Sequence, residues 1–407
     1  TAQLSPPLML PLLLASAFVS PPSSHHLTLA RHPPARCDFA LPTGGPAGVA
    51  LLKQQLAAVA ELTAAAEERE AARSSLSLSQ VVSGMKTSEP SFTRLFTHET
   101  WGYYTGKPPL DRWVMTSLTW RYSTVLRNVW PVCLIFAMFG SLVARVPPML
   151  LPRINPFPLS LQGTAIGLLL VFRTNNSYLR LSEARELWGR AIVLCREIAQ
   201  GMVLGSHVRQ GAPSAAALHV CRYVTGLGWE LAARLSKAEE AEEAQSNAVL
   251  LALLPEEEAA YLATTRSRPL ELIRSMRWVV LQELEAGRLP PALYYKLEED
   301  IRQLDLVVGS CERLFTSPLP PTMTRHLQRC LLLWLGALPI CLAGSMAPLT
   351  IGVWVGVTAY IFTGIEDVGS QVEQPFGIVP MRKLSRLIQV SVEETIRTAP
   401  RPIVSDE

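Results

Sequence analysis

The sequence predicts an all-α membrane protein with four transmembrane helices, arranged two plus two, and a helical domain on the inner side. Hydrophobic residues make up 49% of its 407 residues, and the mean hydropathy of +0.22 is high for a soluble protein. Beyond residue 90, three long apolar stretches carry no charge, and they are residues 129–144, 157–172 and 330–365. Between the second and third stretches, residues 173–327 are rich in helix formers with few strand signals.

The N-terminal residues 1–90 differ in composition from the rest of the chain. Up to Ala60 the only acidic residue is Asp38, and Ser, Ala, Pro and Leu dominate. An acid-poor, Ser-containing N-terminus is typical of organelle transit peptides, although LMLPLLLASAF could instead be the apolar core of a secretory signal. Residues 54–73 (QQLAAVAELTAAAEEREAAR) favour a solvated helix. We therefore predict a transit peptide and a low-complexity linker over residues 1–90.

The first transmembrane helix is expected at about residues 129–151. Its uncharged part, 129–144, would measure about 24 Å, slightly short of a hydrocarbon core of ~30 Å. Arg145 closes this run, and its long side chain could reach the interface while Met149 to Leu151 extend the buried length.

The second helix, residues 157–172 (FPLSLQGTAIGLLLVF), contains several small residues that would let helices approach closely in a bilayer. They are Ser160, Gly163, Thr164, Ala165 and Gly167. The segment is too short and too polar for a lone anchor, so we expect it to pack inside an assembly. It leads directly into the polar helix RTNNSYLRLSEARELWGR.

The last uncharged stretch, Cys330 to Ile365, is too long for a single crossing. One helix of this length would measure about 54 Å. We expect a turn at Ala343 to Pro348, which gives helices at about 328–344 and 347–365. An even number of crossings places both termini and residues 173–327 on one side. The basic residues of that segment favour the cytosolic or stromal side. They are Arg173, Arg180, Arg185, Arg190 and Arg196.

Several chemistries lack a sequence signal. No H-E-x-x-H, G-x-S-x-G or phosphate-loop motif is present, so no enzyme is predicted. The net charge of +3 does not imply nucleic-acid binding. The seven cysteines contain no C-x-x-C pair, and neither a disulfide framework nor a metal site is indicated. We predict no cofactor.

Three blocks of the sequence resemble the bestrophin family of anion channels. FRTNNSYLRLSEARELWGRA resembles the segment after the family's second membrane helix, and GIEDVGSQVEQPFG resembles the segment after its fourth. CERLFTSPLPPTMTRH is similar to the entry to the third helix in the plant and algal branch. The signature residues are Arg173, Asn175, Asn176, Glu183, Arg185, Trp188, Gly189, Glu366, Glu373, Pro375 and Phe376. The resemblance implies a channel domain over residues 91–390 and a C-terminal tail over 391–407.

The resemblance also implies a pore neck. In bestrophins five copies of the second helix surround the pore, and the matching neck positions here are Phe157, Leu161 and Ala165. Without the resemblance, this stripe would be expected to pack against a neighbouring helix. Ala165 departs from the family's larger residue and would widen the pore.

Arg153, four residues before Phe157, could attract anions at the pore entrance. An interfacial anchor to lipid headgroups is the other expectation for this residue.

The segment after PFG bears on calcium. Animal bestrophins follow PFG with an acidic cluster that binds calcium, whereas this chain has GIVPMR and no carboxylate until Glu393. The resemblance therefore implies a calcium-independent channel. We expect Glu366, Asp367 and Glu373 to pair with arginines of the inner domain instead.

The leading expectation is a homopentameric, voltage-dependent chloride channel of the chloroplast thylakoid membrane. The plant and algal likeness supports this location, and the partners would be chloride, membrane lipid and further copies of the chain. Bicarbonate is an alternative ion within the same fold, and nitrate is a further candidate. A non-conducting membrane scaffold that binds partners through residues 173–327 is the alternative from another class.

Overall fold

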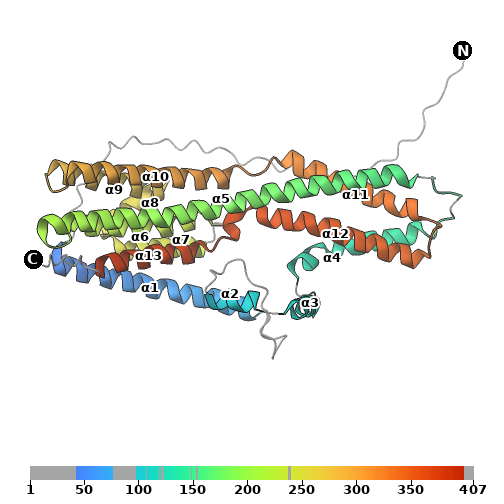
Figure 1. Cartoon of the computed structure of the whole chain (residues 1–407), viewed down its shortest axis with the longest axis horizontal. Coiled ribbons are helices and arrows are strands. Elements are labelled where there is room, and N and C mark those ends of the chain that lie inside the picture. Colours follow the sequence, from blue (N-terminus) through green and yellow to red (C-terminus); the bar gives the residue numbers. More distant parts are fainter. Residues whose placement is uncertain are drawn as a thin grey trace, which may run out of the picture. The chain divides into compact units, whose positions relative to one another are not determined.

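The computed structural model describes residues 43–76 and 98–397, except residues 107, 119, 121–122, 148, 153–154 and 237–239. The described residues form α-helices and one short 3-10 helix, with no strand among them. The helices in chain order are α1 (Gly45–Leu76), α2 (His98–Thr105), α3 (Pro109–Leu118), α4 (Thr124–Val143), α5 (Pro156–Gln210), α6 (Ala215–Leu235), α7 (Glu240–Leu253), α8 (Glu256–Thr264), α9 (Arg268–Glu285), α10 (Pro291–Thr316), α11 (Pro321–Leu342), α12 (Pro348–Glu373), η2 (Pro375–Gly377) and α13 (Met381–Arg397). The predicted all-α class is confirmed (Figure 1).

The longest helix, α5, has 55 residues and measures about 82 Å. Asn155 caps its start by accepting a hydrogen bond from the Phe157 N–H at 3.0 Å, and Pro156 occupies the first turn. Gly211 ends the helix in the left-handed conformation, with φ of 70°. The apolar segment 157–172 and the polar segment after it are therefore one continuous helix. It contacts α11 and α12 as well as α6, α10 and α13 (Figure 1).

Helices α4 and α12 pack closely because glycines face the contact. A Cβ atom on Gly352 would lie 1.9 Å from Ser141 Oγ and 2.6 Å from the Ala137 carbonyl oxygen. Small residues at such a crossing allow backbone-to-backbone approach. Helix α4 ends at Val143, eight residues before the predicted end at 151, because the chain turns from Ala144 onward.

Helix α11 packs along the apolar part of α5. Leu327, Leu331 and Leu335 form a buried cluster with Ile166 and Leu170. The chain then turns at residues 343–347 into α12, so the predicted turn is confirmed. The two helices extend beyond their predicted ranges of 328–344 and 347–365, at the N-terminal end of α11 and the C-terminal end of α12.

Three of the described helices are long and apolar enough to cross a membrane: α4, α5 through its N-terminal part, and α12. Helix α11 does not meet that criterion. The predicted fourth crossing therefore stays a prediction.

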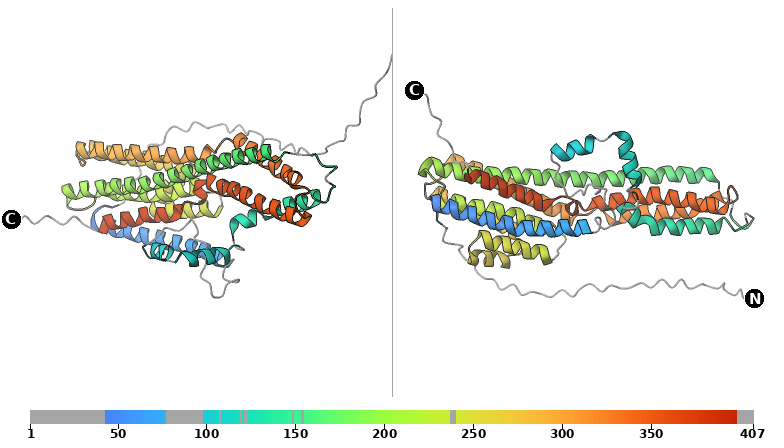
Figure 2. Two further views of the ribbon diagram at one scale, coloured as in Figure 1. Left: turned by 45° about the vertical axis from the view of Figure 1, so that its right-hand side comes forward. Right: turned by 90° about the horizontal axis from the view of Figure 1, so that it is seen from below.

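A second group of helices surrounds α6, most of whose residues are buried. Helices α1, α5, α7, α9, α10 and α13 pack against it (Figure 2). One large core runs through these helices and includes Trp188, Leu218 and Leu227. The predicted helical region 173–327 thus belongs to a helical bundle.

Two predictions at the ends of this bundle need correction. The segment 54–73 was expected to be a solvated linker, but its residues Leu56 and Val59 are fully buried against other helices. Every third or fourth position of α1 is apolar, and this stripe packs on α7, α6 and α13. The predicted tail from 391 is helical to Arg397, with Val392 fully buried. Residues 1–42 lie outside the described residues, so the transit peptide stays a prediction.

Candidate functional site

The predicted neck residues lie on one exposed stripe of α5. Phe157 is 66% exposed and Leu161 is 57% exposed, and Ala165 is exposed as well. The opposite side of the same turns is buried: Leu159 and Ile166 are 7% and 6% exposed. An apolar face without a partner inside one subunit is available to a pore or to another subunit.

Contacts on the packed side fix the rotation of α5. The Trp334 indole N–H donates to the Leu159 carbonyl oxygen at 2.8 Å. A Cβ atom on Gly163 would lie 2.8 Å from the Trp334 ring, so only glycine fits here without a shift. These contacts hold the Phe157 stripe away from α11. Arg153, the predicted anion entrance, lies outside the described residues.

Polar side chains between the neck residues bond to their own helix. The Ser160 hydroxyl donates to the Phe157 carbonyl oxygen at 2.8 Å, and the Thr164 hydroxyl donates to the Ser160 carbonyl oxygen at 3.1 Å. Both hydroxyl protons are donated to carbonyl oxygens of α5 itself. These two side chains therefore offer no free hydrogen-bond donor next to the apolar stripe.

An ion-pair cluster lies where the uncharged segments of α5 and α12 end. Arg173, 4% exposed, contacts Glu366 at 2.6 Å and Glu373 at 3.4 Å. Its guanidinium also donates to the Ser370 hydroxyl at 3.1 Å. Gln328 of α11 donates to the same Glu366 at 2.9 Å. The cluster, which we call the junction cluster, therefore joins α5, α11 and α12 at one level.

The pairing predicted for the acidic residues is confirmed in part. Glu366 and Glu373 pair with Arg173, as expected. Asp367 instead accepts hydrogen bonds from Asn128 at 3.3 Å and from Gln371 at 2.5 Å. Asn128 lies at the start of α4, so Asp367 connects α12 to the first membrane helix rather than to the inner domain.

Arg180 joins α5 to the end of α10. Its guanidinium donates to the carbonyl oxygens of Leu314 and Ser317, both at 2.7 Å, and to the Glu373 carbonyl oxygen at 3.1 Å. The last carbonyl groups of a helix lack partners within it, and a cation there is favourable. One arginine thus satisfies the C-terminal ends of two helices.

The other signature residues divide between core and surface. Trp188 is fully buried, and Pro375 and Phe376 are buried, with the Phe376 ring 6.5 Å from the ring of Phe315. Glu183 accepts from Arg313 at 2.7 Å in an exposed ion pair. The remaining signature positions are at least partly exposed, and they are Asn175, Asn176, Arg185 and Gly189. The structure does not bring these four into the junction cluster.

Sequence reasoning missed the roles of Gln328, Ser370 and Arg180. Gln328 stands directly before Arg329 and the uncharged stretch from Cys330, so the sequence could have placed it at the end of the apolar segment. The Arg180 contacts join residues 134 and 137 positions apart, and no local pattern announces such pairs.

A second buried polar cluster lies inside the helical bundle. The His219 Nε2 atom lies 3.2 Å from Glu258 and 2.9 Å from the Tyr223 hydroxyl, which donates to Glu258. Arg222, 1% exposed, donates to Gln55 of α1 at 2.8 Å. Burial lowers the pKa of the Arg222 guanidinium, while the Cys221 thiol and the Glu258 carboxylate oppose that shift. This cluster ties α1, α6 and α8 together.

The buried thiols of the bundle are chemically protected. Burial raises the pKa of Cys195, Cys221 and Cys311 to about 12. A thiol with so high a pKa forms little thiolate, which is the reactive species and the metal ligand. Among the described residues, no group of three or more His, Cys, Asp and Glu side chains could hold a metal ion.

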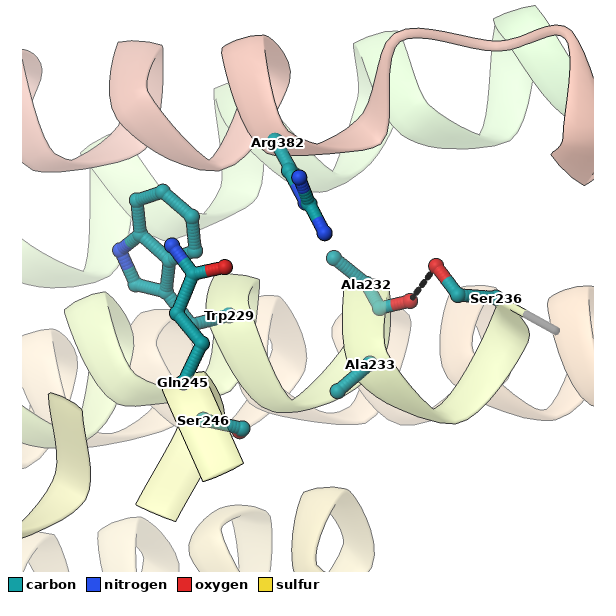
Figure 3. Close-up of a pocket in the computed structure, with 7 residues that line it drawn as sticks. All are labelled: Trp229, Ala232, Ala233, Ser236, Gln245, Ser246 and Arg382. Carbon is teal, nitrogen blue, oxygen red and sulfur yellow. Dashed lines mark hydrogen bonds between the residues drawn. The ribbon is translucent and has the colours of Figure 1, made fainter. Parts of the chain in front are cut away.

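A small pocket opens between α6, α7 and α13 (Figure 3). It holds about 250 Å³ of empty space, part of it open to solvent. Arg382 reaches over α6 toward Ala232, and Gln245 lies beside the ring of Trp229. The Ser236 hydroxyl donates to the Ala232 carbonyl oxygen at 2.9 Å. This pocket lies apart from the neck stripe.

The fold and these sites define a helical membrane protein whose longest helix passes from an apolar layer into a polar helical bundle. The family described as Bacterial/Fungal Bestrophin protein matches residues 105–394. The chain belongs to the bestrophin family. The family predicted from the three sequence blocks is thus confirmed, and the plant and algal branch stays a prediction.

Similar proteins agree with this family. A voltage-dependent anion channel-forming protein of Ralstonia nicotianae is 28% identical, covering 71% of this chain and 92% of that protein. Voltage-dependent chloride channel 2, chloroplastic, of Arabidopsis thaliana is 25% identical and covers 75% of this chain and 73% of its own length. A crystal structure of a bacterial bestrophin homologue from Klebsiella pneumoniae has a TM-score of 0.58 at 25% identity, covering 68% of this chain and all of that chain.

Proposed function

We propose that this chain is the subunit of a pentameric anion channel, with chloride as the permeant ion and five α5 helices around the pore. The observation that carries this proposal is the exposed apolar stripe of Phe157, Leu161 and Ala165, which lies opposite the buried Leu159 and Ile166 on the same helix. One such helix cannot enclose a pore, so several copies are needed. The names of the relatives from Ralstonia and Arabidopsis support an anion channel.

An apolar neck favours anions for two physical reasons. A large, weakly hydrated anion gives up water more easily than a small cation. The edge of an aromatic ring such as Phe157 carries partial positive charge. Hydrophobic constrictions can also close by dewetting, which provides a gate without a moving plug. Ala165 would leave the inner end of the neck wider than its outer end, and Arg153 would concentrate anions at the entrance.

We further propose that the channel is voltage-dependent, calcium-independent and located in the thylakoid membrane of the chloroplast. The name of the Arabidopsis relative supports voltage dependence and, in part, the chloroplast location. The sequence GIVPMR after PFG supports calcium independence, because calcium usually needs several carboxylate oxygens. Four membrane crossings, with α11 as the third, complete the proposal.

Bicarbonate is the second candidate ion, because it carries the same charge as chloride and the neck contains no group that separates them. A non-conducting scaffold that uses the inner helical bundle remains the alternative from another class. The protein would not be an enzyme, whether it is a channel or a scaffold.

Mass and ion-flux measurements on the purified chain test this proposal. Mass measurement in detergent should give a pentamer, and a stable monomer or dimer would count against it. Reconstituted vesicles should release chloride at equal rates with and without a calcium chelator. A folded pentamer that releases neither chloride nor bicarbonate would be a scaffold. A steep loss of flux with the chelator would show that the channel depends on calcium, bound by carboxylates other than those that follow PFG in animal bestrophins.

A further inference from the structure

One face of α11 carries two arginines followed by leucines. Arg325 and Arg329 are both exposed, and Leu332 and Leu333 are 54% and 76% exposed. Spacings of four, seven and eight residues place these side chains on one stripe of a helix. The buried residues of α11, such as Leu331, lie on the opposite side.

The two guanidinium groups have no carboxylate partner among the described residues. The ion pairs of this part of the chain include Arg173 but neither Arg325 nor Arg329. Exposed arginines without a partner are common on a soluble surface. Beside the apolar part of α11 they would lie between water and hydrocarbon, where basic residues are enriched and anionic lipid headgroups can supply the counter-charge.

The junction cluster gives the level of these arginines along the helices. Gln328 donates to Glu366, which also pairs with Arg173, so these residues of α11, α12 and α5 lie at one height. Arg329 follows Gln328 and is the last charge before the uncharged stretch from Cys330 to Ile365. Arg325 lies one helical turn, about 6 Å, further toward the inner side. This is the level expected for lipid headgroups at the inner leaflet.

We propose that Arg325 and Arg329 bind the headgroup of an acidic phospholipid, whose acyl chains lie along Leu332 and Leu333. This inference rests on the proposed membrane crossing of α11. A planar guanidinium matches the paired oxygens of a phosphate, and two of them one turn apart can hold one headgroup. Basic residues at the inner end of membrane helices commonly bind acidic headgroups.

The apolar half of the stripe distinguishes a lipid from a free anion. Free phosphate would need only the two arginines and would gain nothing from Leu332 and Leu333. A lipid contacts both halves, because its charged head and apolar tails follow the same order as the residues along α11. The order of charged and apolar residues along α11 therefore favours a lipid over a free anion.

The full-length chain, purified in detergent, provides the test. It is mixed with equal amounts of phosphatidylglycerol and phosphatidylcholine, and the lipids retained on the intact protein are measured by native mass spectrometry. The parent should retain phosphatidylglycerol preferentially and unfold at a higher temperature with it. Binding should weaken about fivefold for each arginine lost and about thirtyfold for Arg325→Gln with Arg329→Gln. Arg196→Gln, an exposed arginine of the bundle, is the matched control and should bind like the parent.

Three results would overturn the lipid site. The first is equal retention of phosphatidylglycerol by the double variant and the parent. The second is the same thermal stabilisation by glycerol 3-phosphate alone, which would indicate a site for a free anion. The third is dissociation of the assembly in the double variant, which would make the stripe a contact between copies. Chloride release from vesicles of phosphatidylcholine alone tests the channel separately, so either proposal can fail without the other.

Discussion

At the scale of single residues, the junction cluster is where burial and charge act most strongly on each other. Arg173 is 4% exposed, while the side chains of Glu366 and Glu373 are 16% and 21% exposed. Removing water from a charge is costly, and the hydrogen bonds among the three side chains offset that cost. The cluster therefore stabilises only as a complete set.

Replacing Arg173 tests this dependence. Arg173→Met should lower the free energy of unfolding by about 3–5 kcal/mol, because two partly buried carboxylates lose their partner. Arg313→Gln is the control: it removes an exposed pair of comparable length, 2.7 Å to Glu183, and should cost less than about 1 kcal/mol. Chemical unfolding in detergent measures both values. Equal losses in the two variants would show that burial of Arg173 does not govern its contribution.

The neck residues make a separate prediction about conduction. Phe157→Ala and Leu161→Ala should each increase the current or weaken gating, since bulk leaves the pore from every subunit at once. Leu142→Ala removes an equally exposed side chain from α4, at 63% exposure, and should leave the current unchanged. Single-channel recording compares the three variants. Parent-like currents in both neck variants would place the stripe against a neighbouring helix.

At the scale of helices, the contact between α4 and α12 depends on glycine. A side chain at Gly352 would meet Ser141 and the backbone of Ala137 well inside normal contact distance. Gly352→Ala should therefore separate the two helices and lower the thermal midpoint by several degrees, as overpacking of about 1–3 kcal/mol would. Gly336→Ala, where nothing lies within 4 Å, is the matched control. An unchanged midpoint for Gly352→Ala would mean that α4 and α12 do not pack this closely.

Helix α1 makes a second prediction at this scale. Leu56 is fully buried and Leu51 is 40% exposed on the same helix. Leu56→Ala should lower the free energy of unfolding by about 2–5 kcal/mol, whereas Leu51→Ala should change it little. Thermal unfolding of the full chain distinguishes them. If Leu56→Ala lowers the stability no more than Leu51→Ala does, α1 would be a solvated linker after all.

The sequence anticipates helices better than it anticipates what covers them. Runs without charge located the α4, α5, α11 and α12 segments. The excess length of 330–365 located the turn between α11 and α12. Composition misjudged α1, because an Ala- and Glu-rich helix looks solvated until a partner for Leu52 and Leu56 is known. The end of α13 was missed for the same reason, since Val392 and Ile396 are buried only by distant helices.

The candidate site shows the same division. The pairing of Glu366 and Glu373 with an arginine was expected once the missing carboxylates after PFG argued against a calcium role for them. The buried His219, Tyr223 and Glu258 cluster was not expected, because Glu258 is separated from Tyr223 by 35 residues. Spacing predicts contacts within one helix, and it cannot predict contacts between helices that the fold brings together.

At the scale of the whole molecule, one chain contains the apolar stripe of Phe157, Leu161 and Ala165, the junction cluster and a helical bundle. The continuous α5 connects all three, so movement of the bundle would reach the stripe without an intervening loop. The bestrophin family membership and the names of the relatives support anion conduction as the purpose of this arrangement.

The most direct test of that purpose is the reversal potential of the purified protein in a planar bilayer. A potassium chloride gradient across the bilayer separates the equilibrium potentials of the two ions. An anion channel should reverse close to the chloride potential, and replacing chloride by a large organic anion should abolish the current in one direction. Reversal close to the potassium potential, or no current from a folded and inserted assembly, would contradict an anion channel.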